Sequence, residues 1–162
     1  MKIFMAGARH LNALDPSVEQ RMMSIYNKGF EVIVGDCAGI DTSVQKFYSK
    51  LKYSKVTIYA SNGRARNNIG NWPIHKVAVP PYMRGFDYYH QKDIAMANDA
   101  DYGFMIWDGQ SRGTKSNICN LLKQSKPVLV YLVPAKTMIC IKNQNDFLNL
   151  IRLTESSQLS VN

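Results

Sequence analysis

The sequence lacks any apolar run that approaches the length of a membrane span. Its longest apolar stretches, at 102–107 and 127–133, are far shorter than the roughly 20 residues needed to cross a bilayer. The opening residues 1–10 are basic and briefly apolar, but a charged residue follows too soon for a signal peptide. We therefore interpret this segment as a first strand, and we expect a cytoplasmic protein without a membrane partner.

Cysteine is also scarce, which argues against a disulfide framework. The three cysteines are Cys37, Cys119 and Cys140, an odd number without the spacing of metal ligands. Free thiols are the simplest interpretation of this pattern. We accordingly expect no metal site and no cofactor.

Acidic residues are few compared with basic ones. Twelve Asp and Glu stand against 20 Lys and Arg, which gives a net charge of +8. Such a surplus favours anionic partners, namely phosphates, nucleotides or nucleic acid, although a solvated basic surface explains it equally well. Self-association into a homo-oligomer stays open.

The length of 162 residues and the hydrophobic fraction of 46% are typical of one soluble domain. Apolar segments of two kinds alternate along the chain. Strands are expected at 2–7, 30–35, 55–60, 102–109 and 127–133, and helices at 15–29, 37–51, 85–101, 114–126 and 145–153. A short strand is expected within 74–83 and a further edge strand at 137–142. The pattern predicts one Rossmann-like, doubly wound, mostly parallel α/β domain over residues 1–153, with helices on both faces and a frayed tail at 154–162.

Glycine-containing loops follow the first, second and fourth main strands of this expected sheet. They read GARHL, GDCAGID and WDGQSRGT, and ligands of doubly wound sheets bind at this edge. Glycine lets a ligand approach the backbone, and the following helix offers free N–H groups to a phosphate. The candidate ligand-binding residues in these loops are Gly7, Arg9, Gly35, Asp36, Gly39, Asp41, Trp107, Gly109, Ser111, Gly113 and Thr114.

Several of these residues have a specific expected role. Arg9 is a candidate phosphate partner, and Asp41 could accept a hydrogen bond from a loop amide or a ribose hydroxyl. Thr114 could cap the following helix or bind a phosphate oxygen, as could Ser111. Trp107 could stack on a base, but a place in the core suits it equally well.

The helix expected over 85–101 carries a second group of candidates. Lys92, Asp93 and His90 could form a catalytic set, with His90 and Asp93 as an acid/base pair. The alternative is an amphipathic helix with packed tyrosines and solvated charges. Trp72 lies in the long, Asn-rich loop at 61–73 and is a candidate aromatic lid.

The loops lack the G-x-G-x-x-G and Walker patterns, but their ordered combination resembles another group. GARH, GDCAGIDTSVQKF and DGQSRGTKSNI are similar to motifs of the SMF/DprA–LOG superfamily of Rossmann-like nucleotide-binding domains, nearest to its small YspA-like branch. The resemblance extends over about residues 1–133. It implies a nucleotide or nucleotide-derived ligand at the carboxyl edge of the sheet, bound by a sensor or a divergent nucleotide-processing enzyme.

Two branches of that superfamily imply alternative functions. The LOG branch consists of phosphoribohydrolases that use an Arg-Lys pair and a Glu after the Gly-Thr of the last loop. Here Lys92 and Asp93 stand in place of the pair, and KSN follows Thr114 without a carboxylate. The DNA-processing branch binds single-stranded DNA, which the net charge would suit. An N-glycosidase acting on nucleotides and a module that binds single-stranded nucleic acid are therefore the two alternatives.

Overall fold

Seven strands form a single, mostly parallel sheet in the computed structural model, which describes residues 1–159 and the side chains of residues 1–156. The strands are β1 (Lys2–Gly7), β2 (Glu31–Val34), β3 (Val56–Ser61), β4 (Ile74–Val77), β5 (Tyr102–Trp107), β6 (Val128–Leu132) and β7 (Thr137–Ile141). Their spatial order is β4-β3-β2-β1-β5-β6-β7, and only β7 is antiparallel to its neighbour. The Rossmann-like α/β fold expected from the sequence is confirmed.

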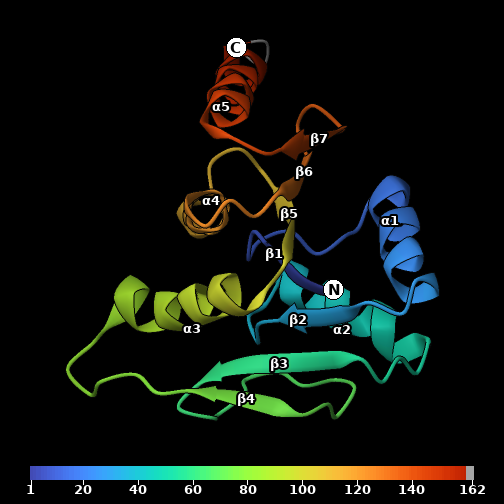
Figure 1. Ribbon diagram of the computed structural model, residues 1–162, viewed down its shortest axis with the longest axis vertical. Helices are drawn as coiled ribbons and strands as arrows, with labels where there is room; N and C mark the ends of the chain where they lie inside the picture. The colour runs from blue at the N-terminus through green and yellow to red at the C-terminus, as the bar shows by residue number, and fades with distance from the viewer. Residues whose placement is uncertain (160–162) are drawn as a thin grey trace.

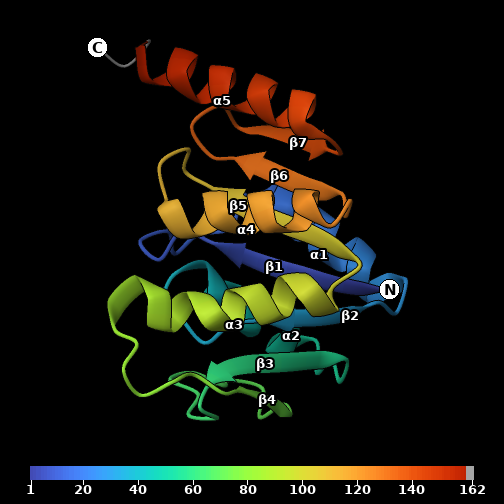
Figure 2. The same ribbon diagram turned by 60° about the vertical axis from the view of Figure 1, so that its left-hand side comes forward.

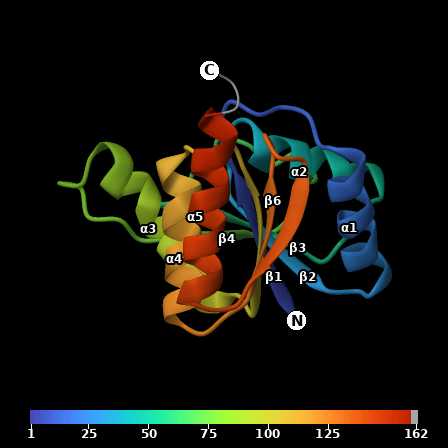
Figure 3. The same ribbon diagram turned by 90° about the horizontal axis from the view of Figure 1, so that it is seen from above.

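Five helices cover both faces of the sheet, as Figure 3 shows from above. They are α1 (Pro16–Asn27), α2 (Ile40–Lys50), α3 (Gly85–Asp99), α4 (Arg112–Lys123) and α5 (Gln144–Leu159). One core lies under α1 and α2 and contains Val18, Met22, Val44 and Tyr48. The other lies under α3, α4 and α5 and contains Met96, Ile118, Leu121 and Phe147.

Burial on both faces explains why the central strands are almost continuously apolar. All five residues of β6 are buried, whereas β4 at one edge is mostly exposed. The edge strand β7 is also only partly buried. The sequence predicted a short strand at the position of β4 and an edge strand at the position of β7, and both are present.

The strands β2, β3 and β4 lie on one side of β1, and β5, β6 and β7 lie on the other. The order of strands therefore reverses at β1, which is the topological switch point of the sheet (Figure 1). β1 pairs with β2 on one side and with β5 on the other, with Met5 opposite Val34 and Gly7 opposite Ile106. The loops after β1, β2 and β5 therefore leave the same edge side by side. Figure 2 shows α3 and α4 lying next to each other across the face beside this point.

Several boundaries differ from the expected ones. α4 begins at Arg112, two residues before the expected start, so Gly113 and Thr114 lie inside its first turn. α5 continues to Leu159, past the expected end at residue 153, and residues 160–162 lie outside the described chain. Within residues 1–159, no helix combines the length and the apolar character that a bilayer span requires.

Candidate functional site

A cleft of about 560 Å³ opens at the switch point, between the loops after β1, β2 and β5 and the first turns of α3. The loops after β1 and β5 are joined there by His10, whose Nε2 lies 3.2 Å from Asp108 Oδ2. Nine of the residues expected at a site line this cleft: Gly7, Arg9, Asp41, His90, Lys92, Asp93, Ser111, Gly113 and Thr114. The fold thus brings residues from four separate segments to one cavity.

The loop after β2 is tied to the long loop at 61–73 by Asp36. Its carboxylate accepts hydrogen bonds from Arg66 Nη2 at 2.9 Å, from Arg66 Nε at 3.2 Å and from the Arg66 backbone N–H at 2.9 Å. Burial acts to raise the pKa of Asp36, but the hydrogen bonds from Arg66 outweigh it and leave that pKa below its usual value. Asp36 therefore holds Arg66 and does not line the cleft.

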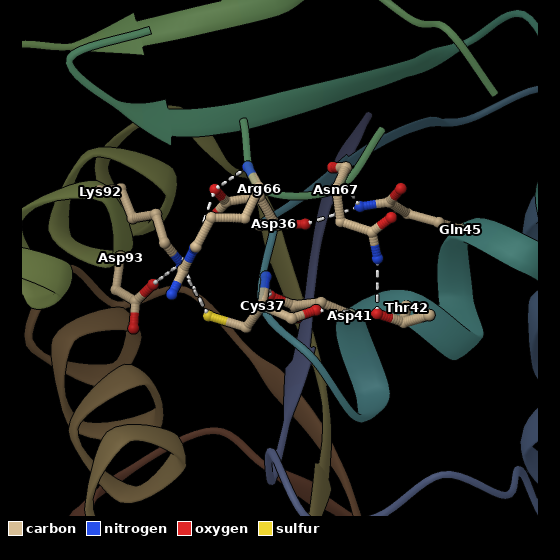
Figure 4. A network of polar contacts seen from close by, with 10 residues as sticks. Asp36, Cys37, Asp41, Thr42, Gln45, Arg66, Asn67, Lys92 and Asp93 are labelled. Carbon is tan, nitrogen blue, oxygen red and sulfur yellow. Dashed lines mark hydrogen bonds and ion pairs between the residues drawn. The ribbon is translucent and has the colours of Figure 1, made fainter. Parts of the chain in front are cut away.

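Lys92 is buried at the junction of this network and the cleft (Figure 4). Its Nζ lies 3.3 Å from Asp93 Oδ1, 3.6 Å from Cys37 Sγ and 3.9 Å from Asp36 Oδ1. Only 3% of the side chain is exposed, so the alternative of a solvated lysine on an amphipathic helix is wrong. Burial acts to lower the pKa of Lys92, but the charges of Asp93 and Asp41 raise it overall, so the amine is charged.

Asp41 is the buried carboxyl of the α2 first turn. Its Oδ2 accepts a hydrogen bond from the Cys37 backbone N–H at 3.1 Å. Burial raises the pKa of Asp41 to about 6, against the opposing attraction of the Lys92 charge. A carboxyl that titrates in this range beside a cleft is a group that a ligand can shift between its two protonation states.

Two glycines of the β2–α2 loop make this packing possible. A Cβ on Gly35 would lie 2.7 Å from both Asp41 Oδ2 and Lys92 Nζ. A Cβ on Gly39, which has a φ of +79°, would lie 2.2 Å from the Arg9 carbonyl oxygen. Both positions therefore permit close contacts within the protein, and neither lines the cleft.

The β5–α4 connection is organised differently. Asp108 Oδ1 accepts hydrogen bonds from the backbone N–H groups of Gln110 and Ser111, at 2.9 and 2.7 Å. Ser111 is the N-cap of α4, but no side chain caps this helix end. Capping by Thr114, considered from the sequence, is therefore wrong, and its Oγ1 instead lies 3.4 Å from Ser111 Oγ.

Three further candidates of this connection, Gly113, Gly109 and Trp107, have different surroundings. A Cβ on Gly113 would meet nothing within 4 Å, so the backbone there faces open space. Gly109 lies outside the cleft lining, where a Cβ would be 3.3 Å from Thr154. Trp107 is 1% exposed, and its Nε1 donates to the Ser111 carbonyl oxygen at 3.1 Å. The indole therefore supports the loop from the core and is not available to stack on a base.

Arginines stack on aromatic rings around the mouth of the cleft. Arg9 and Arg66 lie over the Tyr89 ring, with guanidinium carbons 5.3 and 4.5 Å from its centre. Arg112 lies over Phe86 at 3.9 Å, and the Phe86 ring also stacks on His90. Within residues 1–159 no ion pair joins His90 to Asp93, which contacts Lys92 instead. The mouth is thus cationic, whereas the interior contains carboxylates.

Sequence reasoning missed four residues that complete this arrangement: Cys37, Arg66, Phe86 and Asn117. Arg66 belongs to the long loop, whose length alone marked it for attention. Trp72, the candidate lid of that loop, is instead buried, and its Nε1 donates to the Tyr53 carbonyl oxygen at 2.7 Å. Asn117 gave no signal, because a polar residue on a helix is ordinarily solvated.

Comparison with known proteins supports the fold. No protein-family model and no curated protein matches the sequence. Among solved structures, DNA processing protein A from Helicobacter pylori, described for its single-stranded DNA binding mode, is similar with a TM-score of 0.59 and 17% identity. The match covers 80% of this chain and 64% of that one. This likeness, together with the sheet order, shows that the protein has a Rossmann-like α/β fold.

Proposed function

We propose that this protein binds a nucleotide or nucleotide-derived ligand in the switch-point cleft, as a sensor or a divergent nucleotide-processing enzyme. The observation that carries the proposal is the uncapped start of α4 beside a cleft whose lining includes several charged side chains. The first N–H groups of a helix have no partner within the helix, and they attract anions together with the helix dipole. Gly113, whose Cα faces open space, leaves room for a phosphate there.

The charges around the cleft support the same orientation of the ligand. Arg9 and Arg112 line its mouth near the start of α4 and supply cations for the phosphate. Asp41 and Asp93 line the interior, where a carboxylate suits hydroxyl groups rather than phosphate. Lys92 contacts Asp93 and attracts the charge of Asp41, and we propose that it contributes positive charge to the ligand as part of that network.

Binding of purified protein to AMP, ADP, GMP and NAD, measured by isothermal titration calorimetry, tests the proposal. Mass spectrometry of small molecules released from the freshly purified protein provides an unbiased second assay. We expect at least one phosphorylated nucleoside to bind, and we expect its affinity to fall sharply in Gly113→Val. Absence of binding to every nucleotide, together with no co-purified phosphorylated compound, would contradict the proposal.

Single-stranded DNA is the second candidate ligand, favoured by the structural neighbour and by the net charge of +8. A strand that contacts several phosphates releases counterions, so its affinity falls by orders of magnitude between about 50 and 200 mM salt. A nucleotide enclosed in the cleft responds much less. Titration of a fluorescent oligo-dT across this range, with AMP in parallel, separates the two functions.

A further inference from the structure

A second pocket, of about 270 Å³, opens at the edge of the sheet opposite the switch-point cleft. Residues at the start of β1 and β5 line it, together with Phe30, which precedes β2. The pocket therefore lies where these parallel strands begin, and the second half of α1 forms one of its walls. It shares no lining residue with the switch-point cleft, so it is a separate feature of the molecule.

The interior of this pocket is apolar. Its lining includes four buried side chains, from β1, α1, β5 and β6: Ile3, Ile25, Phe104 and Leu129. Two further rings, Phe30 and Tyr102, are only partly buried. Aromatic rings pack favourably on another ring, stacked or edge to face, so this lining suits a planar apolar group. The volume is at the small end of the range for ligand pockets, roughly 300–1,000 Å³, which favours a group of one or two rings.

The α1 wall of the pocket is cationic. Arg21, Ser24 and Lys28 follow one another at helical spacing, so they share the face of α1 that lines the pocket. The Lys28 amine lies 5.9 Å from the centre of the Phe30 ring. Within residues 1–156 neither Arg21 nor Lys28 forms an ion pair, and no carboxylate lines the pocket. The switch-point cleft differs in this respect, because carboxylates lie among its cations.

Arg21 of α1 and Tyr102 of β5 lie close to each other on this lining. Burial and the neighbouring Cys140 raise the pKa of Tyr102 to about 12, and the positive charge of Arg21 acts against that rise. The guanidinium is therefore near the hydroxyl end of the Tyr102 ring. Positive charge and an aromatic surface thus meet at the same side of the pocket.

We propose that this pocket binds a small aromatic carboxylate, with its ring on the apolar interior and its carboxylate beside Arg21 and Lys28. A neutral aromatic compound leaves both cations without a partner, and an aliphatic acid lacks the ring that packs on the three aromatic side chains. Inorganic phosphate matches the cations but not the apolar interior. The inference does not depend on the proposed function, because the two sites are separate.

Titration of 2-naphthoate into ¹⁵N-labelled protein, followed by amide chemical shifts, both locates and measures binding. Naphthalene-2-methanol has the same rings without the charge, and octanoate has the charge without a ring. We expect 2-naphthoate to shift the amides of residues 21–30 and 102–104 and to bind about tenfold more tightly than naphthalene-2-methanol, the combined effect of two exposed ion pairs. Octanoate should bind more weakly than 2-naphthoate. Equal affinity for any two of these ligands overturns the inference, and so do shifts confined to the switch-point cleft.

Variants that remove charge test the role of α1. Arg21→Gln and Lys28→Gln keep polar side chains on an exposed helix face, so the fold should be preserved, and each should weaken 2-naphthoate binding by about two- to fivefold. The double variant should bind 2-naphthoate no better than it binds naphthalene-2-methanol. Lys115→Gln removes the same charge from the exposed face of α4 and should bind as wild type does. Wild-type affinity in the double variant would overturn the inference.

Other occupants of the pocket give different results in the same spectra. AMP and oligo-dT should leave the amides of residues 21–30 unshifted and should not displace 2-naphthoate. Displacement by either would assign the pocket to a nucleotide or a nucleic acid and overturn the inference. Shifts of these amides with protein concentration, in the absence of ligand, would assign this face to contact between two copies of the chain and overturn it as well. If AMP fails to bind anywhere while 2-naphthoate binds here, the proposed function falls and this inference stands.

Discussion

The loops after β2 and β5 leave the same sheet edge, yet their polar groups are used in opposite ways. After β2, Asp36 is satisfied by Arg66, and the network that forms there includes the buried Lys92 of α3 (Figure 4). After β5, the start of α4 has no side-chain cap in the described chain. A satisfied network rigidifies a fold, whereas unsatisfied groups beside a cleft are available to a ligand. Substitutions after β2 should therefore affect stability, and substitutions after β5 should affect binding.

Removal of the Lys92 amine is expected to have the largest effect on stability. Lys92→Ala leaves the buried carboxyl of Asp41 and the partly buried carboxylate of Asp93 without their cation, and loss of one partner from a buried ionic group costs about 3–5 kcal/mol. Urea unfolding measures this change, and the exposed Lys115→Ala is the control, expected within about 0.5 kcal/mol of wild type. In conditions where Lys92→Ala stays folded, nucleotide affinity should fall by roughly tenfold to a hundredfold. Equal stability of the two variants would show that the network does not depend on Lys92.

Glycine substitutions compare the two loops directly. Gly113→Val should reduce nucleotide affinity by about a hundredfold or more, because its side chain fills the space left for a phosphate. Its free energy of unfolding should change by less than about 1 kcal/mol, because a Cβ there meets nothing within 4 Å. Gly39→Ala should instead impair folding itself, since its Cβ would lie 2.2 Å from the Arg9 carbonyl oxygen. Wild-type affinity in folded Gly113→Val would place the ligand elsewhere.

The pH dependence of stability should separate Asp41 from its neighbour Asp36. The pKa of Asp41 is about 6 in the folded protein against about 3.9 when unfolded. Its contribution to stability is therefore greatest below about pH 4 and is lost as the pH rises to about 6, by an amount on the order of 2 kcal/mol. Asp36 has a lowered pKa, so it stabilises the fold above about pH 4, and this is lost as the pH falls.

Asp41→Asn removes one of these two effects and keeps the other. Urea unfolding of the variant between about pH 2 and 7 should lack the loss of stability that wild type shows as the pH rises above about 4, whereas the loss of stability on acidification below about pH 4 should be retained. The same loss in both proteins would show that Asp41 does not titrate in this window.

The last prediction concerns catalysis, for which we expect the smallest measurable signal. KSN follows Thr114, so no carboxylate stands after the Gly-Thr of the α4 loop to stabilise positive charge on a ribose. We expect little or no release of free base from AMP or GMP, measured by chromatography. Rapid release would require another carboxylate, and loss of that activity in Asp93→Asn would identify it.

The sequence pattern was sufficient to predict the fold, because strands that are buried on both faces of a sheet are almost continuously apolar. Apolar strands alternating with amphipathic helices predicted the parallel sheet, and the glycine-containing loops predicted the edge at which the cleft lies. Side-chain pairing could not be predicted in this way. Nothing near Asp36 in sequence indicates that Arg66, 30 residues later, occupies its carboxylate.

The amino-acid sequence by itself determined the order of the elements, the location of the loops and the basic character of the protein, since these depend on local pattern and composition. Only the tertiary structure decided which polar residues face inward. From the sequence, Lys92 suited a site or a solvated helix face, and it is buried among carboxylates. Asn117 gave no signal in the sequence, and it is enclosed beside the cleft. Both outcomes depend on how α3 and α4 pack against each other and against β1, through contacts between residues far apart in the chain.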